Sequence, residues 1–146
     1  MLALVQRVTQ ARVEVQGDTV AEIGPGLLVL VCAEPADPPA SAVRLVDRLL
    51  RLRIFADASG RMNRSLQEVA GGLLLVPQFT LAADLTSGQR PGFSGAAPPA
   101  QARVLFDAVV ADASARHAPV GSGVFGAHMQ VHLVNDGPVT IPLQLR

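Results

Sequence analysis

A Gly-Pro pair interrupts a strand-like run near the C-terminus, within Asn135-Asp136-Gly137-Pro138-Val139-Thr140. Proline has no N–H to donate and fixes φ, while glycine adopts conformations that other residues cannot, so the pair breaks any ladder that contains it. An X-Pro bond can also be cis at a cost of only ~0.5–1 kcal/mol. On composition alone, the pair predicts a tight turn that joins a strand at Val131–Val134 to a strand at Val139–Leu143.

The chain has 146 residues, of which 49% are apolar and 16% are charged. This length predicts one domain, residues 1–146, and the composition excludes a disordered chain. The longest apolar run, Leu27–Ala33, has the length of a strand and falls far short of the ~18 residues of a membrane span. The N-terminus does not have the pattern of a signal peptide, so we expect a cytoplasmic protein. The single cysteine, Cys32, lies in the apolar run and is expected to be an inert buried thiol.

The formal net charge is zero, and all twelve basic residues are arginine. A neutral chain is not expected to bind nucleic acid through a general electrostatic field. The absence of lysine excludes Schiff-base chemistry and a P-loop lysine. Arginine suits bidentate contacts with phosphate, so an RNA partner bound by a local arginine patch is one explanation of this composition. A GC-rich genome or a hot habitat is the other.

Alternation of apolar and polar residues, or short continuous apolar runs, predicts strands along most of the chain. The expected strands are Leu2–Val8, Ala11–Val15, Thr19–Ile23, Leu27–Ala33, Arg53–Phe55, Leu73–Val76, His128–Val134 and Val139–Leu145. The segment from Leu85 to Pro99 has no period and is rich in Gly, Ser and Pro, which predicts a long loop of the kind that is often functional.

Two segments have the period of an amphipathic helix, from about Pro39 to Leu52 and from Pro98 to about Arg116. Strands with two main helices interspersed predict an α/β or α+β fold, built on a twisted mixed sheet or an open β-barrel. The expected apolar faces of the two helices are Val43, Val46, Leu49 and Leu50, and Leu105, Phe106, Val109 and Val110.

Three patterns resemble functional motifs but stand in the wrong context. Gly121–Gly126 matches G-x-G-x-x-G but follows a helix and leads into a strand, so it predicts a flexible connector. His128 and His132 on a strand would lie ~13 Å apart, too far to share a metal ion. Gly92-Phe93-Ser94-Gly95 approximates a nucleophile elbow but has Ala96 where the last glycine is needed. We therefore expect no cofactor, no metal and no Ser-His-Asp triad.

A second polar segment, Pro77-Gln78-Phe79-Thr80-Leu81, ends a predicted buried strand. Taken alone, this segment predicts only a strand end whose polar side chains are exposed to solvent. Together with Val5-Gln6-Arg7-Val8 and with Asn135–Thr140, it resembles the D-aminoacyl-tRNA deacylase family, editing enzymes that free tRNA from D-amino acids. The resemblance covers essentially the whole chain and implies a symmetric homodimer whose partner is the acceptor end of aminoacyl-tRNA.

The resemblance implies a pocket in which Gln78, Phe79 and Thr80 line the carbonyl side of the ester. The main-chain N–H groups of Phe79 and Thr80 would face the carbonyl oxygen as it becomes negative, a form of catalysis that needs neither an acid nor a base. The 2′-hydroxyl of the tRNA would assist or orient the attacking water.

The resemblance also assigns residues that bind the substrate. Gly137 and Pro138, joined by a cis bond, would screen the α-carbon from the partner subunit, and Arg7 would brace their carbonyls. Phe125 and Met129 lie where the family receives the terminal adenosine. The implied activity is hydrolysis of D-aminoacyl-tRNA and glycyl-tRNA, with L-aminoacyl-tRNA spared.

One residue departs from the family pattern. Most members have serine where this chain has Pro77, and a related branch that edits L-alanyl-tRNA has proline there. Phe79 matches the D-specific pattern. Two alternatives therefore stay open: a deacylase with a shifted, L-alanyl-tRNA-type substrate range, and a non-catalytic RNA-binding accessory protein that uses the arginines alone.

Overall fold

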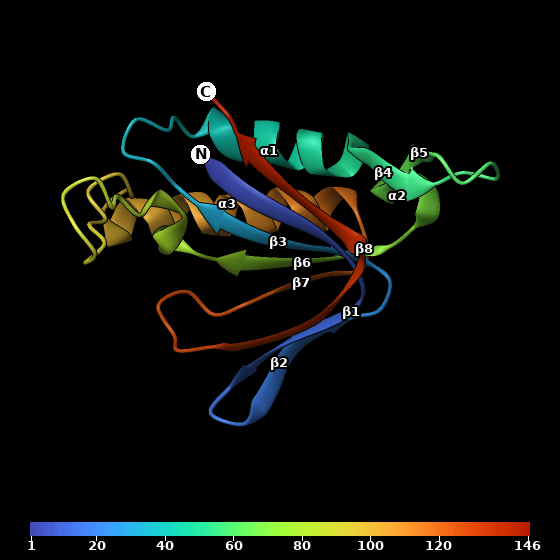
Figure 1. The fold of residues 1–146 in the computed structure, drawn as a ribbon, viewed down its shortest axis with the longest axis horizontal. Coiled ribbons are helices and arrows are strands. Elements are labelled where there is room, and N and C mark those ends of the chain that lie inside the picture. The colour runs from blue at the N-terminus through green and yellow to red at the C-terminus, as the bar shows by residue number, and fades with distance from the viewer.

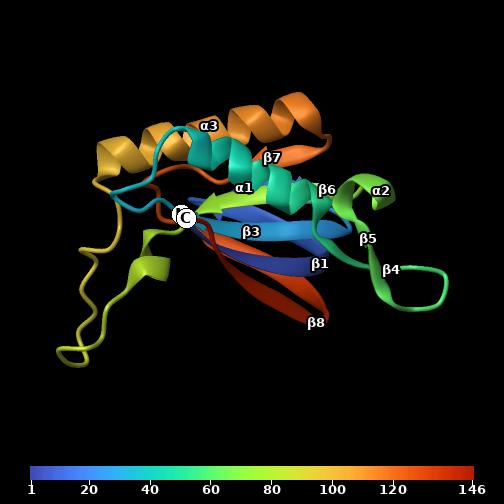
Figure 2. The same ribbon diagram turned by 90° about the horizontal axis from the view of Figure 1, so that it is seen from above.

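The computed structural model describes residues 1–146 and consists of a curved sheet covered on one face by two long helices, α1 and α3 (Figure 1). Figure 2 shows α1 and α3 side by side over that face. None of the helices is long and apolar enough to cross a membrane. The elements are β1 (Leu2–Val15), β2 (Asp18–Ile23), β3 (Gly26–Cys32), α1 (Ala40–Arg51), β4 (Arg53–Ala56), β5 (Met62–Ser65), α2 (Leu66–Val69), β6 (Gly72–Pro77), the 3-10 helix η1 (Phe79–Ala82), α3 (Pro99–Arg116), β7 (Val120–Ser122) and β8 (Gln130–Gln144).

The sheet is organised around β1. The first half of β1 pairs with β3 and the second half with β2, while β8 pairs with β1 along its other edge, all antiparallel. β3, β6 and β7 continue the sheet in parallel. β7 also approaches β2, because a Cβ added at Gly121 would lie 3.2 Å from the Cβ of Ala21. The sheet is therefore mixed and curls into a nearly closed barrel, which confirms the predicted fold class.

Side chains of β3 alternate between two cores. Leu27 and Val29 belong to the larger core, which includes the buried faces of α1 and α3. Leu28 belongs to a smaller core on the other side of the sheet, together with Leu74 of β6 and Val13 of β1. Because both faces of β3 are covered, its sequence is continuously apolar rather than alternating.

The two main helices lie where the sequence predicts them, but their buried faces differ in detail. In α1 the buried side chains include Leu45 and Val46, whereas Val43, predicted to be buried, is 48% exposed. In α3 the buried face extends to Ala113, while Val110 is only half-buried. The apolar face of a helix is broad, so the apolar pattern alone does not determine which residues at the margins of that face are buried against the sheet.

The predicted tight turn at the Gly-Pro pair is wrong. β8 is one continuous strand, and both of its halves pair with β1 rather than with each other. Gln6 is opposite Thr140 and Val8 is opposite Asn135, so residues 136–139 bulge out of the ladder opposite Arg7 alone. The chain continues past the bulge without reversing, because β1 pairs with β8 on both sides of it.

Several short elements have no counterpart in the prediction: β5, α2, η1 and β7. The strand β7 includes Gly121 and Ser122, so the first part of the Gly-rich motif is an edge strand paired with β6 and not a connector. The loop from Leu85 to Pro99 is irregular, as predicted, apart from a bridge between Asp84 and Gly92.

Candidate active site

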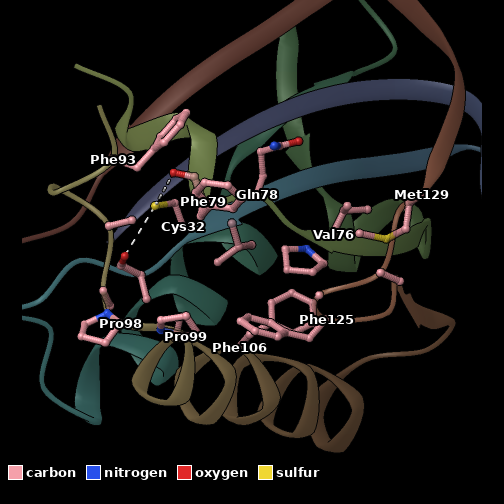
Figure 3. Close-up of a pocket in the computed structure, with 18 of the residues that line it drawn as sticks. Cys32, Val76, Gln78, Phe79, Phe93, Pro98, Pro99, Phe106, Phe125 and Met129 are labelled. Carbon is pink, nitrogen blue, oxygen red and sulfur yellow. Dashed lines mark hydrogen bonds between the residues drawn. The ribbon is translucent and has the colours of Figure 1, made fainter. Parts of the chain in front are cut away.

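A pocket of about 680 Å³ opens between the start of α3, the end of β6, η1 and the segment that joins β7 to β8 (Figure 3). Of its 21 lining residues, 15 are hydrophobic. Such a lining suits a flat base or an amino-acid side chain and is poorly suited to phosphate.

The wall of this pocket that includes Gln78 and Phe79 begins where β6 ends. Gln78 N donates to Val31 O at 2.8 Å, which keeps the chain beside β3 for one more residue before it turns into η1. Phe79 then projects into the mouth of the pocket, 56% exposed, with its ring edge-on to Phe93 at a centroid distance of 5.0 Å. Gln78 Nε2 donates to Thr80 Oγ1, so these two side chains support each other beside the pocket.

Two main-chain N–H groups at this turn have no acceptor within the turn. The first hydrogen bond of η1 runs from Leu81 N to Gln78 O at 3.3 Å. The N–H groups of Phe79 and Thr80 precede it, so the helix offers them no acceptor. Neither N–H therefore has an acceptor within η1.

The opposite wall is aromatic and is held by close packing. Phe125 lies 6.4 Å from Phe106 of α3 by ring centroid, and the guanidinium carbon of Arg103 lies 4.9 Å from the centroid of Phe125. Gly123 N donates to Leu75 O at 2.8 Å, which fixes the start of this segment to β6. A Cβ at Gly123 would lie 2.8 Å from the Sδ of Met129, so a larger residue there would displace the end of the Met129 side chain.

Cys32 lies in the pocket wall behind Phe79. Its Sγ donates to the main-chain oxygens of Ala33 at 3.5 Å and Phe79 at 3.6 Å, and burial raises the pKa of the thiol. A raised pKa lowers the fraction of thiolate, so the arrangement favours a structural thiol over a nucleophile.

The two histidines of the sequence motif lie apart. His128 is exposed at the edge of the pocket, and its Nε2 lies 3.3 Å from Gln130 Nε2. His132 instead lies beside Arg12 and Glu14 on the neighbouring strand β1. No group of three or more His, Cys, Asp or Glu side chains is placed to hold a metal ion.

The Gly-Pro bulge of β8 lies outside the pocket and is exposed. The bond between Gly137 and Pro138 is cis, and Gly137 has a φ of 144°. Asn135 closes the base of the bulge, since its Oδ1 accepts from Val139 N at 2.7 Å and its Nδ2 donates to Val139 O at 3.2 Å.

Arg7 holds this bulge from β1. Its Nε donates to Asp136 O at 3.0 Å and its Nη1 donates to Ile54 O at 2.6 Å. The two carbonyls that it contacts therefore belong to Asp136 and Ile54, rather than to Gly137 and Pro138 as the resemblance implied. Arg7 thus ties the bulge of β8 to the start of the β4–β5 hairpin.

The sequence model of the D-Tyr-tRNA(Tyr) deacylase family matches residues 4–144. The chain belongs to this family. A D-aminoacyl-tRNA deacylase of Methylibium petroleiphilum is 66% identical over 98% of this chain and 94% of its own length. One of Paracidovorax citrulli is 63% identical over 99% of this chain and 94% of its own length. A solved structure described as a c-Myc DNA Unwinding Element Binding Protein is 38% identical, with a TM-score of 0.94, over 100% of this chain and 99% of that one.

The structure brings together half of the residues that the family resemblance selects. Four of them line the pocket, and Thr80 lies beside it through its contact with Gln78. Arg7, Gly137 and Pro138 are outside the pocket of their own chain. The four that line the pocket are Gln78, Phe79, Phe125 and Met129.

Sequence reasoning missed several residues that shape the site. Phe93 comes from the long loop, and Phe106 was assigned only to the core face of α3, although it also lines the pocket. Gly123 was read as part of a flexible connector, yet it is buried and closely packed. The only sequence signal for Phe93 was its place in a long loop without period, which often marks a binding segment.

Proposed function

We propose that this protein is a D-aminoacyl-tRNA deacylase that hydrolyses the ester between a D-amino acid and the 3′ end of tRNA. The observation that carries the proposal is the mostly apolar pocket of about 680 Å³, lined by Gln78 and Phe79 beside the start of η1, where the N–H groups of Phe79 and Thr80 have no acceptor within the helix. Membership of the D-Tyr-tRNA(Tyr) deacylase family, and relatives that are named D-aminoacyl-tRNA deacylases, support the same substrate.

In this proposal the carbonyl oxygen of the ester points at the N–H groups of Phe79 and Thr80. Each preorganised donor of this kind lowers the barrier of acyl transfer by about 3 kcal/mol, because it stabilises charge that develops only in the transition state. Gln78 lines the same side. The attacking water is oriented by the vicinal 2′-hydroxyl of the tRNA.

Phe125 and Met129 receive the terminal adenosine. The ring of Phe125 offers a stacking surface, and base-aromatic stacking contributes about 1–3 kcal/mol per base. Met129 is unbranched and packs against an irregular surface with little specificity of its own.

Gly137 and Pro138 act as the chiral filter of a neighbouring subunit in a symmetric homodimer. Their exposure, together with the hydrogen bonds from Arg7 and Asn135, suits an element that is rigid in one chain and inserted into another. A rigid backbone close to the α-carbon excludes an L side chain but admits a D side chain. Glycine has no side chain to exclude, so glycyl-tRNA is also hydrolysed.

Pro77 lies in the pocket wall, half-buried, where most of the family has serine. The change removes a hydroxyl and a backbone donor from the carbonyl end of the pocket. A deacylase with a shifted, L-alanyl-tRNA-type range is therefore the closest variant of this proposal.

The proposal extends to where and how the protein works. Residues 1–146 form one domain, and the protein acts in the cytoplasm, because aminoacyl-tRNA is used there.

The test is a deacylation assay with purified protein and D-tyrosyl-, L-tyrosyl-, L-alanyl- and glycyl-tRNA. Rapid loss of the D-tyrosyl and glycyl esters, with the L-tyrosyl ester intact, supports the proposal. Preferential loss of L-alanyl-tRNA moves the protein to the shifted range. Analytical ultracentrifugation of the same sample tests the dimer. Full activity in a monomer at micromolar concentration would exclude a chiral filter supplied by a second subunit.

A second candidate is a nucleic-acid-binding protein without ester turnover. It is favoured by the 38% identical structure described as a DNA unwinding element binding protein. This candidate predicts strongly salt-dependent binding of nucleic acid and an unchanged half-life of every aminoacyl ester. The same assay therefore separates the two.

A further inference from the structure

The arginines of this neutral chain are segregated. Eight of the twelve have no carboxylate within salt-bridge distance, and six of these eight are consecutive basic residues of one stretch. All six are exposed. We call them the basic strip: Arg44, Arg48, Arg51, Arg53, Arg61 and Arg64.

The first half of the strip is a row on α1. Arg44, Arg48 and Arg51 are spaced i, i+4 and i+7, so they lie on one side of the helix. The acidic residue of this helix, Asp47, forms its salt bridge with Arg116 of α3 and none with this row.

The second half of the strip lies on the β4–β5 hairpin, which directly follows the C-terminal end of α1 (Figure 1). The carboxylate of Asp57 is occupied within its own turn, by Ser59 N at 2.9 Å, Ser59 Oγ at 2.7 Å, Arg61 N at 3.0 Å and Asn63 Nδ2 at 3.2 Å. Arg53 and Arg64 donate to neutral oxygens only. The guanidinium of Arg61 has no hydrogen-bond partner.

The strip is coupled to the Gly-Pro bulge. Arg7 donates to Asp136 O and to Ile54 O, so the bulge and the first strand of the hairpin share one bracing side chain. The strip is absent from the lining of the chain's own pocket, which has no arginine at all. If the bulge enters a partner's pocket, the hairpin is carried to the mouth of that pocket with it.

We propose that the basic strip of one subunit binds the phosphates of the tRNA acceptor arm whose 3′ end occupies the pocket of the other subunit. The inference rests on the deacylase activity and the dimer proposed above. Charge complementarity identifies the partner, because exposed and unpaired guanidinium groups match the phosphate backbone in charge and in bidentate geometry. The pocket then selects the ester, while the strip supplies the affinity for RNA that an apolar pocket lacks.

The experiment compares two triple variants of equal charge. Arg48→Gln/Arg51→Gln/Arg61→Gln removes three guanidinium groups of the strip that make no hydrogen bond within the protein, so the fold is not expected to change. Arg12→Gln/Arg90→Gln/Arg146→Gln removes three charges outside both strip and pocket. Each variant and the parent are assayed on D-tyrosyl-tRNA and on D-tyrosyl-adenosine, a minimal ester without phosphate, over a series of salt concentrations.

The strip variant is expected to lose about tenfold or more in kcat/KM on the tRNA ester and nothing on the adenosine ester. Its plot of log kcat/KM against log salt should be shallower by about 2–3, because each lost contact with a phosphate removes about 0.7 (single strand) to 0.9 (duplex) from the slope. The control variant should stay within about twofold of the parent on both substrates, as surface changes away from a site usually do.

Equal loss on both esters, or equal loss in the control, overturns the inference but leaves the deacylase activity standing. A parent that hydrolyses neither ester overturns the proposed function and the inference with it. Turnover of both esters with no effect of the strip variant contradicts the inference alone.

Mixed dimers test the arrangement in trans. One subunit type carries the strip replacements, and a pocket-blocking Gly123→Leu is placed either on that same subunit or on its partner. The inference predicts high activity on tRNA when the two changes are on different subunits, because the open pocket then faces an intact strip. High activity only when both changes share a subunit would contradict it.

Discussion

The pocket and the Gly-Pro bulge are held in place by different forces. The pocket is a concave, mostly apolar site whose walls come from β6, α3 and the segment before β8, and its shape depends on close packing at Gly123. In the bulge, Asp136, Gly137 and Pro138 are exposed, and hydrogen bonds from Arg7 and Asn135 hold the chain there. Packing therefore shapes the surface proposed to accept the substrate, whereas directed hydrogen bonds fix the surface proposed to select its handedness.

The largest effect is expected from filling the space at Gly123. In Gly123→Val the new Cβ overlaps the Sδ of Met129, so the end of this side chain, which lines the pocket, must shift. We expect KM for aminoacyl-tRNA to rise by about a hundredfold and the free energy of unfolding to fall by about 1–3 kcal/mol, as for overpacking in general. Steady-state kinetics and urea denaturation measure the two effects. Gly24→Val is the control, because nothing lies within 4 Å of a Cβ there; equal losses in both variants would contradict the packing account.

A smaller but more selective effect is expected at Arg7. Arg7→Met removes two donors, and the carbonyls of Asp136 and Ile54 lose their charged partner, so the free energy of unfolding should fall by about 1–3 kcal/mol. The loosened bulge should lower the ratio of D- to L-tyrosyl-tRNA hydrolysis by about tenfold, or about 1.4 kcal/mol. Arg12→Met, on the same strand, should leave the ratio unchanged. A ratio that survives in Arg7→Met would mean that the bulge needs no bracing.

The smallest effect is expected at Thr80. If its main chain and not its hydroxyl serves catalysis, Thr80→Val should stay within about fivefold of the parent in kcat, or about 1 kcal/mol. The valine keeps the shape of the side chain and loses only the bond from Gln78. A thousandfold drop, worth ~4 kcal/mol, would make the hydroxyl a direct participant and would move the catalytic role from backbone to side chain.

The sequence predicts the sheet and its two long helices because their period is carried by many residues. Leu27 and Val29, for example, repeat the same signal as Leu73 and Leu75, and all four are fully buried. The predicted burial of Val43 in α1 was wrong, because one exposed valine hardly changes the apolar period from which the buried face is predicted.

The course of the chain at Gly137 was predicted wrongly for a physical reason. A Gly-Pro pair signals a break in a ladder, but whether the chain then reverses or continues depends on the partner strand. Here β1 is long enough to pair on both sides of the break. No local residue carries that information.

The candidate site was predictable only in part. Gln78 and Phe79 follow a buried strand, and the family motif includes them, so the sequence identifies them. Phe106 comes from a distant helix, and the role of Gly123 depends on the position of Met129. Such contacts arise from packing between segments that are far apart in the chain.

A rigid bulge that selects handedness for a permissive pocket should give the protein a strong preference for D-aminoacyl esters. This preference is tested most directly by the ratio of kcat/KM for D- and L-tyrosyl-tRNA with the purified parent protein. We expect a ratio of about ten-thousandfold, which corresponds to about 5.5 kcal/mol. Comparable turnover of the two esters would contradict it.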